Sequence, residues 1–245
     1  MNSSLFSAQP LATPCASRAR LLVRMGAAGL LTLTLAACGV SRVDEVAVTW
    51  PSFKSGEPVV LPSDPAQCPE LGGTYRAQGE LRAGEENGAL KDLRTFFLYP
   101  LGLPGMRESL LPEWRLTDQA TVSMAAEGRG WSVLALDGQG SRSAARLPMQ
   151  DGAQDMTAMP GDARLNMPDG IRRYTGCTQG RLWVSVRHDW RQHEAMGVRR
   201  HVAMFRPQDG GLLVTVQRES DSIGLLPWYS NESSVSQYWF APVQP

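Results

Sequence analysis

The first 38 residues constrain this chain most strongly, because they decide which part of it can fold. A basic segment with three arginines precedes an apolar run over residues 25–35, and the tetrapeptide Leu-Ala-Ala-Cys follows at residues 35–38. A basic start, a short apolar run and small residues, in that order, are typical of a secretory signal peptide that is removed from the mature protein. The alternative is a buried helix of a soluble domain. The absence of any acidic residue before Asp44 favours the signal peptide.

The apolar stretch is too short to cross a membrane. Residues 25–37 would span about 20 Å as a helix at ~1.5 Å per residue. The hydrocarbon core of a bilayer, ~30 Å thick, needs about 20 apolar residues. Because Arg24 blocks extension toward the N-terminus, we expect residues 1–37 to be a cleaved signal peptide.

A cysteine placed directly after two alanines resembles the lipobox of bacterial lipoproteins. The resemblance implies cleavage between Ala37 and Cys38, with lipid attached to Cys38 as the first residue of the mature protein. Stable anchoring needs more than one acyl chain, and lipoproteins of this type carry two or three. Gly39 stands where enteric bacteria use aspartate to retain lipoproteins at the inner membrane. The resemblance therefore implies an outer-membrane lipoprotein that faces the periplasm.

The remaining cysteines are expected to pair. Cys15 lies in the signal peptide and Cys38 is assigned to lipid, which leaves Cys68 and Cys177 in an oxidising compartment where disulfides persist. Such a bond would close a loop of about 110 residues, worth roughly 4–5 kcal/mol in the chain-entropy model. The alternative is two unpaired buried thiols.

Residues 38–67 are expected to form a lipid-anchored flexible tether. The stretch contains Pro51, Pro58, Pro62 and Pro65, and proline fixes φ and removes a backbone donor. As a random coil, residues 39–67 would span ~30 Å. Residues 46–50, Val-Ala-Val-Thr-Trp, could instead form a short strand docked on the body.

The sequence of residues 68–245 predicts a single all-β domain. Alternating segments at residues 120–126, 131–136 and 141–147, joined by glycine-containing turns, indicate an antiparallel meander. Further strands are expected at the following ranges: 181–190, 197–206, 212–218 and 237–240. Residues 89–98 fit a helix or a strand, and residues 148–170 read as a long exposed loop. The pattern suggests a sandwich or a small barrel and does not choose between them.

The start of this domain carries a second resemblance. Cys68-Pro-Glu-Leu-Gly-Gly-Thr-Tyr75, followed by Gly79-Glu80, resembles the C-P-x-L-x-G-x-Y…G-E opening of a group of proteobacterial lipoproteins. The aromatic end at residues 238–240 is also similar. In that group the motif opens the folded domain after a lipobox and tether, so the resemblance implies architecture and no mechanism.

Three histidines form the first candidate metal site. A hairpin centred near residues 194–195 would place His188 roughly opposite His201, with His193 in the turn. With Asp189 or Glu194 such a pair could bind Zn²⁺ or Cu²⁺. The alternative, histidines packed in ordinary strands, is the stronger interpretation, and we assign no metal ligand.

Methionines form a second candidate, since Met149, Met156, Met159 and Met167 cluster and thioethers favour Cu(I). Their irregular spacing fits apolar filling better. The hydrolase patterns G-x-S-x-G and H-E-x-x-H are absent from the sequence, and so is a complete dinucleotide-binding loop. We therefore assign no catalytic residue and no cofactor.

These features predict a non-enzymatic, lipid-anchored envelope protein with a binding or scaffolding role toward an envelope protein partner. Removing the signal peptide leaves a net charge of −3 and no basic stripe, which argues against nucleic-acid binding. A carrier of an apolar small molecule or lipid is the alternative. Aromatic residues crowd the last third of the chain and could fill the core or line a cleft. Trp228 and Tyr229 could mark a partner interface.

Overall fold

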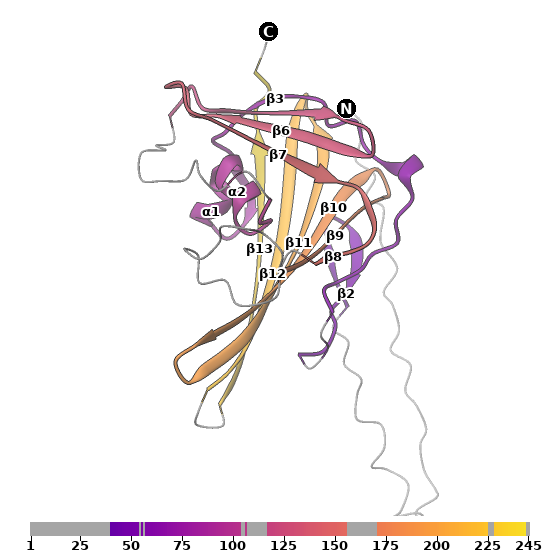
Figure 1. Ribbon diagram of the computed structural model, residues 1–245, viewed down its shortest axis with the longest axis vertical. Coiled ribbons are helices and arrows are strands. Elements are labelled where there is room, and N and C mark those ends of the chain that lie inside the picture. The colour runs from indigo at the N-terminus through magenta and orange to yellow at the C-terminus, as the bar shows by residue number, and fades with distance from the viewer. Residues whose placement is uncertain are drawn as a thin grey trace, which may run out of the picture. The chain divides into compact units, whose positions relative to one another are not determined.

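A computed structural model describes residues 40–53, 55, 57–103, 106, 117–155, 171–224 and 228–243 (Figure 1). Within these residues the fold is all-β and every strand pairing is antiparallel, as the sequence predicts. No helix among them is long and apolar enough to cross a membrane.

The larger of the two main sheets has seven strands and is open. Its order is β4 (Glu80–Gly84), β13 (Tyr229–Phe240), β12 (Gly211–Ile223), β11 (Ala195–Gln208), β10 (Arg181–Gln192), β9 (Ile171–Thr178) and β8 (Gln150–Asp155). The strands β10 to β13 contain 12 to 14 residues each and run well past the rest of the domain (Figure 1). Because β4 and β8 form the two edges, the described strands make a sandwich and not a closed barrel.

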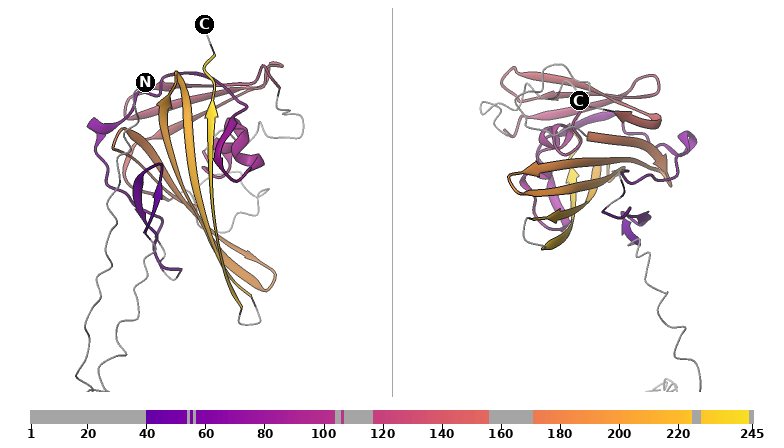
Figure 2. Two further views of the ribbon diagram at one scale, coloured as in Figure 1. Left: turned by 180° about the vertical axis from the view of Figure 1, so that it is seen from behind. Right: turned by 60° about the horizontal axis from the view of Figure 1, so that its bottom comes forward.

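The smaller sheet contains the predicted meander. Its order is β3 (Gly73–Arg76), β5 (Thr121–Ala126), β6 (Gly130–Leu136) and β7 (Arg142–Pro148). It covers one face of the larger sheet, and the two sheets enclose the main core (Figure 2). The core is filled by large side chains from both layers, including Trp131, Phe205, Tyr238 and Phe240.

Two short helices complete this core. α1 (Gly88–Lys91) and α2 (Leu93–Leu98) each begin at a side chain that accepts a backbone hydrogen bond, Asn87 and Asp92 respectively. Such N-caps satisfy donors that a helix start leaves free. Of the two alternatives for residues 89–98, helix is therefore correct, and α2 packs Phe96 and Phe97 against Phe205.

The segment expected to be a free tether packs on the opposite face of the larger sheet. β1 (Val40–Val43) and β2 (Val46–Thr49) form a hairpin, and its apolar side chains join a second core cluster. The members from the sheet are Trp183, Val202 and Met204, and those from the segment are Val43, Val46, Val48, Trp50, Val59 and Leu61. The docked strand proposed for residues 46–50 is confirmed. A flexible tether is wrong for residues 40–61, because burying these apolar side chains offsets the loss of chain entropy.

A disulfide joins this segment to the larger sheet, as predicted. The Cα atoms of Cys68 and Cys177 lie 4.9 Å apart across the bond, and Cys177 is fully buried. Just before Cys68, the short 3₁₀ turn η1 (Pro65–Gln67) follows Asp64, whose amide donates to the carbonyl of Cys177 at 2.8 Å. The bond therefore closes the end of the docked segment onto β9.

The loop predicted over residues 148–170 is wrong for its first part. Residues 150–155 form β8, which pairs with β9 through an irregular register between Gln150 and Gln154. An edge strand needs backbone pairing on one side only, so β8 forms without a regular apolar alternation. Residues 156–170 lie outside the described part of the chain.

Candidate functional site

The predicted cleavage and lipidation residues, Ala37 and Cys38, lie outside the described residues. The first described residue is Val40, which pairs with Thr49 in the β1–β2 hairpin. Two residues of extended chain reach at most ~7 Å. A lipid on Cys38 would therefore lie close to the folded part of the domain, without an intervening spacer.

Two of the three histidines meet in the structure, in a register that differs from the prediction. β10 and β11 pair His188 with Arg199 and His201 with Val186, so the histidines are diagonal neighbours on one face and not directly opposite. Their rings still contact, with centroids 5.7 Å apart. His193 is exposed in the turn, away from this pair.

The surroundings of the pair favour neutral rings. Both are buried, and the ring of Tyr99 contacts each of them. His188 Nε2 lies 3.0 Å from the carbonyl of Pro100. Burial lowers the pKa of His188, and it lowers the pKa of His201 further, with added repulsion from His188. A cavity of about 80 Å³ borders His201 and Tyr99.

Among the described residues, no third metal ligand completes a site with this pair. Asp189 points to the opposite face of β10 and binds Arg187 at 2.8 Å, as the alternation of a strand requires. Glu194 is exposed in the turn. Among the described residues there is no group of three or more His, Cys, Asp or Glu able to hold a metal ion.

The methionine cluster divides between described and undescribed residues. Met149 packs against the main core, and its sulfur lies 4.0 Å from the Cys177 sulfur. Met156, Met159 and Met167 lie outside the described residues. Met149 thus acts as apolar filling, as the alternative interpretation expects.

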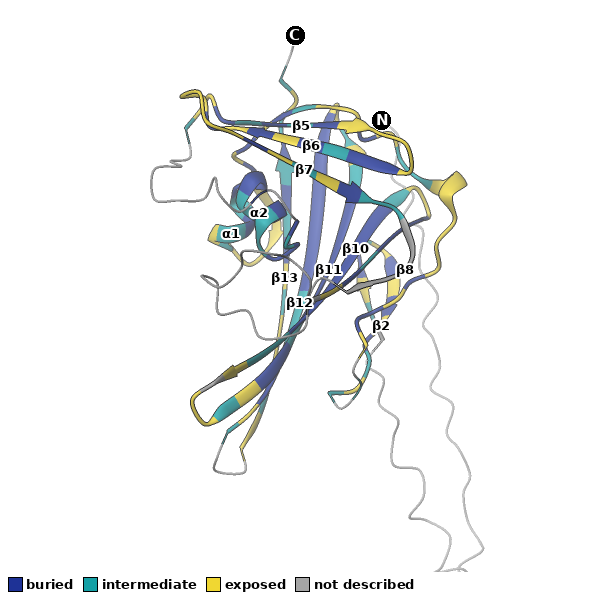
Figure 3. Cartoon of the chain, in the orientation of Figure 1, coloured by how far each residue is buried: buried dark blue, intermediate teal, exposed yellow. Residues whose placement is uncertain are grey.

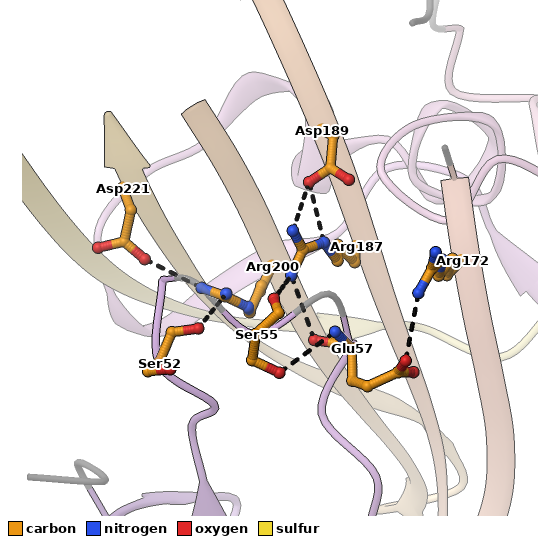
Figure 4. A network of polar contacts seen from close by, with 8 residues as sticks. All are labelled: Ser52, Ser55, Glu57, Arg172, Arg187, Asp189, Arg200 and Asp221. Carbon is orange, nitrogen blue, oxygen red and sulfur yellow. Dashed lines mark hydrogen bonds and ion pairs between the residues drawn. The ribbon is translucent and has the colours of Figure 1, made fainter. Parts of the chain in front are cut away.

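A polar network fixes the chain after β2 to the outer face of the larger sheet (Figure 4). The fully buried Arg200 donates to Asp221 at 2.9 Å and to the Ser52 carbonyl at 3.0 Å. The neighbouring Arg187 donates to the carbonyl of Ser55 and pairs with Asp189. Sequence patterns could not have revealed this network, because its strands and the segment lie more than a hundred positions apart in the chain.

Asp221 also connects this network to β13. Its carboxylate accepts from Tyr229 Oη at 2.5 Å and from Asn231 Nδ2 at 2.8 Å. Burial alone would raise the pKa of Asp221, but these hydrogen bonds and Arg200 hold it below its usual range. The ring of Tyr229 in turn contacts Phe53, with centroids 6.3 Å apart. The segment after β2 is therefore held against the far ends of β11, β12 and β13.

At these far ends lies an exposed apolar surface, which we call the distal surface. Met196, Ile223 and Tyr229 are aligned across β11, β12 and β13 by their register. Phe53 contacts the ring of Tyr229, and Trp228, one position before Tyr229, lies at the same end on the opposite face. The exposed fractions are 52% for Met196, 37% for Ile223, 50% for Trp228 and 59% for Tyr229. Figure 3 shows how this exposed end contrasts with the buried middle of the same strands.

A shallow apolar hollow adjoins the distal surface. Its lining includes Phe53, Trp190, Met196 and Val198. Trp190 lies over Gly197, its cross-strand partner, where a Cβ atom would come within 2.5 Å of the indole ring. Of the aromatic residues considered in the sequence, Trp183, Tyr238 and Phe240 fill the core, whereas Trp228 and Tyr229 are on the surface. Contiguous exposed apolar groups of this kind are typical of interaction sites.

Comparison of the chain with protein-family models, curated proteins and solved structures finds no match. The two sequence resemblances therefore stand on the residues that carry them.

Proposed function

We propose that this chain is a lipid-anchored cell-envelope protein with a non-enzymatic binding or scaffolding role, facing the periplasm from the outer membrane. One observation supports this most directly. The Leu-Ala-Ala-Cys sequence at residues 35–38 ends two positions before β1, the first described strand, whose hairpin packs on the larger sheet. A signal peptide followed at once by a folded domain is the arrangement that cleavage before Cys38 would require.

The disulfide agrees with this location. Cys68 and Cys177 are bonded, and disulfides persist in the periplasm and not in a reducing cytoplasm. This bond uses both cysteines of the described residues. The cysteine next to the fold is Cys38, which the proposal assigns to lipid.

The alternative role, transport of an apolar molecule, needs an enclosed cavity of suitable size. Between the described sheets the space is occupied by side chains such as Phe96, Phe97, Phe205 and Trp131. Small-molecule sites usually enclose ~300–1,000 Å³ and are mostly apolar, whereas the cavity beside His201 measures about 80 Å³. A larger hollow of about 540 Å³ lies at the surface and is lined mainly by polar residues such as Arg76, Gln78 and Glu80. No described feature favours the carrier over a binding module.

The anchor is tested on full-length protein purified from membranes of a bacterium that processes lipoproteins. Trypsin cleavage after Arg42 should release a peptide of residues 38–42 with the mass of two or three acyl chains on Cys38. A Cys38→Ser variant should lose this acylated peptide. An unmodified Cys38, or an intact residue 37–38 bond in the wild type, would contradict the proposal.

The binding role is tested by chemical crosslinking in intact cells, followed by identification of the crosslinked species. A discrete protein adduct is expected on the wild-type chain. Native mass spectrometry of the purified protein provides the comparison with the carrier. A stoichiometric small-molecule adduct that leaves on unfolding, without a protein adduct, would favour the carrier instead.

A further inference from the structure

We propose that the distal surface, made of Phe53, Met196, Ile223, Trp228 and Tyr229, is a second membrane contact that rests in the headgroup region of a lipid layer. It would act beside the anchor on Cys38, so the proposed role in cells rests on the proposed function. The lipid contact itself is a property of the folded domain and can be measured without the anchor.

The first step concerns the direction of the β1–β2 hairpin. Its turn is bound at one end of the larger sheet, where Asp44 pairs with Arg181 at 2.7 Å and with Arg206 at 2.9 Å. Arg206 and Met196 lie on the same strand, ~33 Å apart at ~3.3 Å per residue. The open end of the hairpin, where Val40 pairs with Thr49, therefore points away from that turn and toward the distal surface.

Contacts of the following residues confirm this direction. Ser52 is held by Arg200, and Phe53 packs on Tyr229. Phe53 comes only four positions after Thr49, a distance of at most ~14 Å of extended chain. Cys38 reaches at most ~7 Å from Val40. An anchor at Cys38 would thus hold the distal end of the strands next to the membrane.

The chemistry and shape of the distal surface suit a lipid layer. Tryptophan and tyrosine are enriched at membrane interfaces, because an apolar ring with a polar tip matches the headgroup region. Here the ring of Tyr229 stands beside Ile223 and Met196 on one face, and the half-exposed Trp228 lies at the same strand end on the opposite face, over Gly224. The surface lies on the projecting end of the long strands (Figure 2). A projecting end can enter a soft layer, whereas a protein partner would need a matching concave surface.

The charges near this surface are largely matched within the protein. Arg200 pairs with Asp221, and Arg187 pairs with Asp189 (Figure 4). Exposed Arg191 and Glu194 carry opposite charges near the β10–β11 turn. We therefore expect apolar contact to dominate, so that binding depends weakly on lipid charge and on salt.

Vesicle flotation tests this inference with the mature chain from residue 38, carrying Cys38→Ser to remove the lipid site. Every described core residue lies between residues 43 and 240, so this chain retains both hydrophobic clusters. The probes are vesicles of zwitterionic phosphatidylethanolamine and phosphatidylcholine, with or without phosphatidylglycerol. The chain is expected to float with both, and the bound fraction should change less than about two-fold between low and high salt, unlike an electrostatic contact.

The variant Met196→Ser/Trp228→Ser should weaken vesicle binding at least about ten-fold, because it removes two half-exposed apolar groups. The matched control is Leu81→Ser/Leu134→Ser, which removes two exposed leucines from other parts of the domain and should leave binding unchanged. A wild-type chain that stays out of the vesicle fraction would overturn the inference. Equal binding by the two double variants would overturn it as well.

A second measurement does not depend on how the double variant folds. Bromine-labelled lipids quench tryptophan emission at short range, so they should quench part of the wild-type emission. In a Trp228→Phe variant, which keeps an apolar ring, that part should disappear while flotation persists. Quenching unchanged by this substitution would refute contact at Trp228. Neither measurement uses the anchor. Both can therefore fail although Cys38 is lipidated, and both can succeed although Cys38 is not lipidated.

Discussion

The buried histidine pair should make the folded state lose stability in mildly acidic solution. Burial keeps His188 and His201 neutral by lowering the pKa of both, and repulsion from His188, Arg218 and Arg199 adds to the shift at His201. Attraction by Asp189 and the Pro100 carbonyl opposes the shift at His188 only in part. In the unfolded chain both groups return to a pKa of about 6.5. The unfolded state therefore binds protons that the folded state excludes, and stability falls as the pH drops below about 6.5.

The magnitude follows from proton linkage. A histidine that stays neutral in the folded state lowers the free energy of unfolding by ~1.2 kcal/mol between pH 7 and pH 5.5. Two such groups lower it by about 2.5 kcal/mol, and by an amount between about 1.2 and 2.5 kcal/mol if His188 begins to take up a proton in that window. Glu219 acts in the opposite direction, because burial raises its pKa. A comparison with histidine variants separates the two effects.

Urea unfolding at pH 7 and pH 5.5, with the disulfide intact, measures this change. The variant His188→Gln/His201→Leu should lose most of the pH dependence, since glutamine retains a donor for the Pro100 carbonyl and leucine does not titrate. His193→Asn is the matched control, because His193 is exposed and adopts a positive φ of 52° that asparagine tolerates. It should keep the wild-type pH dependence. A wild-type stability that is flat over this range, or a variant with the same slope, would refute the argument.

Two further predictions concern the bonds that hold the docked segment. The disulfide joins residues 109 positions apart. Its removal in Cys68→Ser/Cys177→Ser should lower the free energy of unfolding by about 2–5 kcal/mol in urea titrations. A smaller loss would mean that other contacts close this loop. Arg200→Met should cost ~3 kcal/mol by leaving Asp221 buried without its cation. Adding Asp221→Asn should recover part of that loss, while Lys91→Met at the exposed pair with Glu86 should change stability by less than about 1 kcal/mol. Equal effects at Arg200 and Lys91 would contradict the reasoning.

The meander could be predicted because its local signals agree. Residues 120–126, 131–136 and 141–147 alternate in polarity and are separated by glycines that take positive φ values, such as Gly128 and Gly138. Glycine adopts this conformation without steric cost. Between the strands predicted at residues 197–206 and 212–218, the chain turns at Asp209-Gly210, where φ is 51° and 73°. Local chemistry was therefore sufficient to predict these strands, which expose one face, and these turns, which need glycine.

The β10–β11 register was wrong because its turn lacks such a signal. His193 and Glu194 occupy the turn without a glycine, and the pairing is centred between them. The predicted centre lay one position later. Because cross-strand pairs shift by two when the centre moves by one, His188 meets Arg199 and contacts His201 only diagonally.

Packing of the N-terminal segment depends on distant residues and was only partly predictable. A docked strand at residues 46–50 was one of two alternatives, and Trp50 is indeed buried. Nothing local shows that Val59 and Leu61 are buried, since prolines flank both positions. Their partner Trp183 becomes available only when the larger sheet has formed. The distal surface has the same origin, because Met196 and Ile223 lie on the face that the N-terminal segment covers and are exposed where β11 and β12 run past that segment.

The docked segment changes what an anchor on Cys38 can do. A free tether of residues 39–67 would let the domain adopt any orientation relative to the lipid, at ~30 Å of mean reach. In the structure Asp44 and Ser52 are instead bound to arginines of the larger sheet, so few rotatable residues remain between Cys38 and the fold. An anchored domain of this kind would have restricted orientations at the membrane. The apolar residues at its distal end could then reach the headgroups at little further entropic cost, since the anchor has already removed most of the translational freedom.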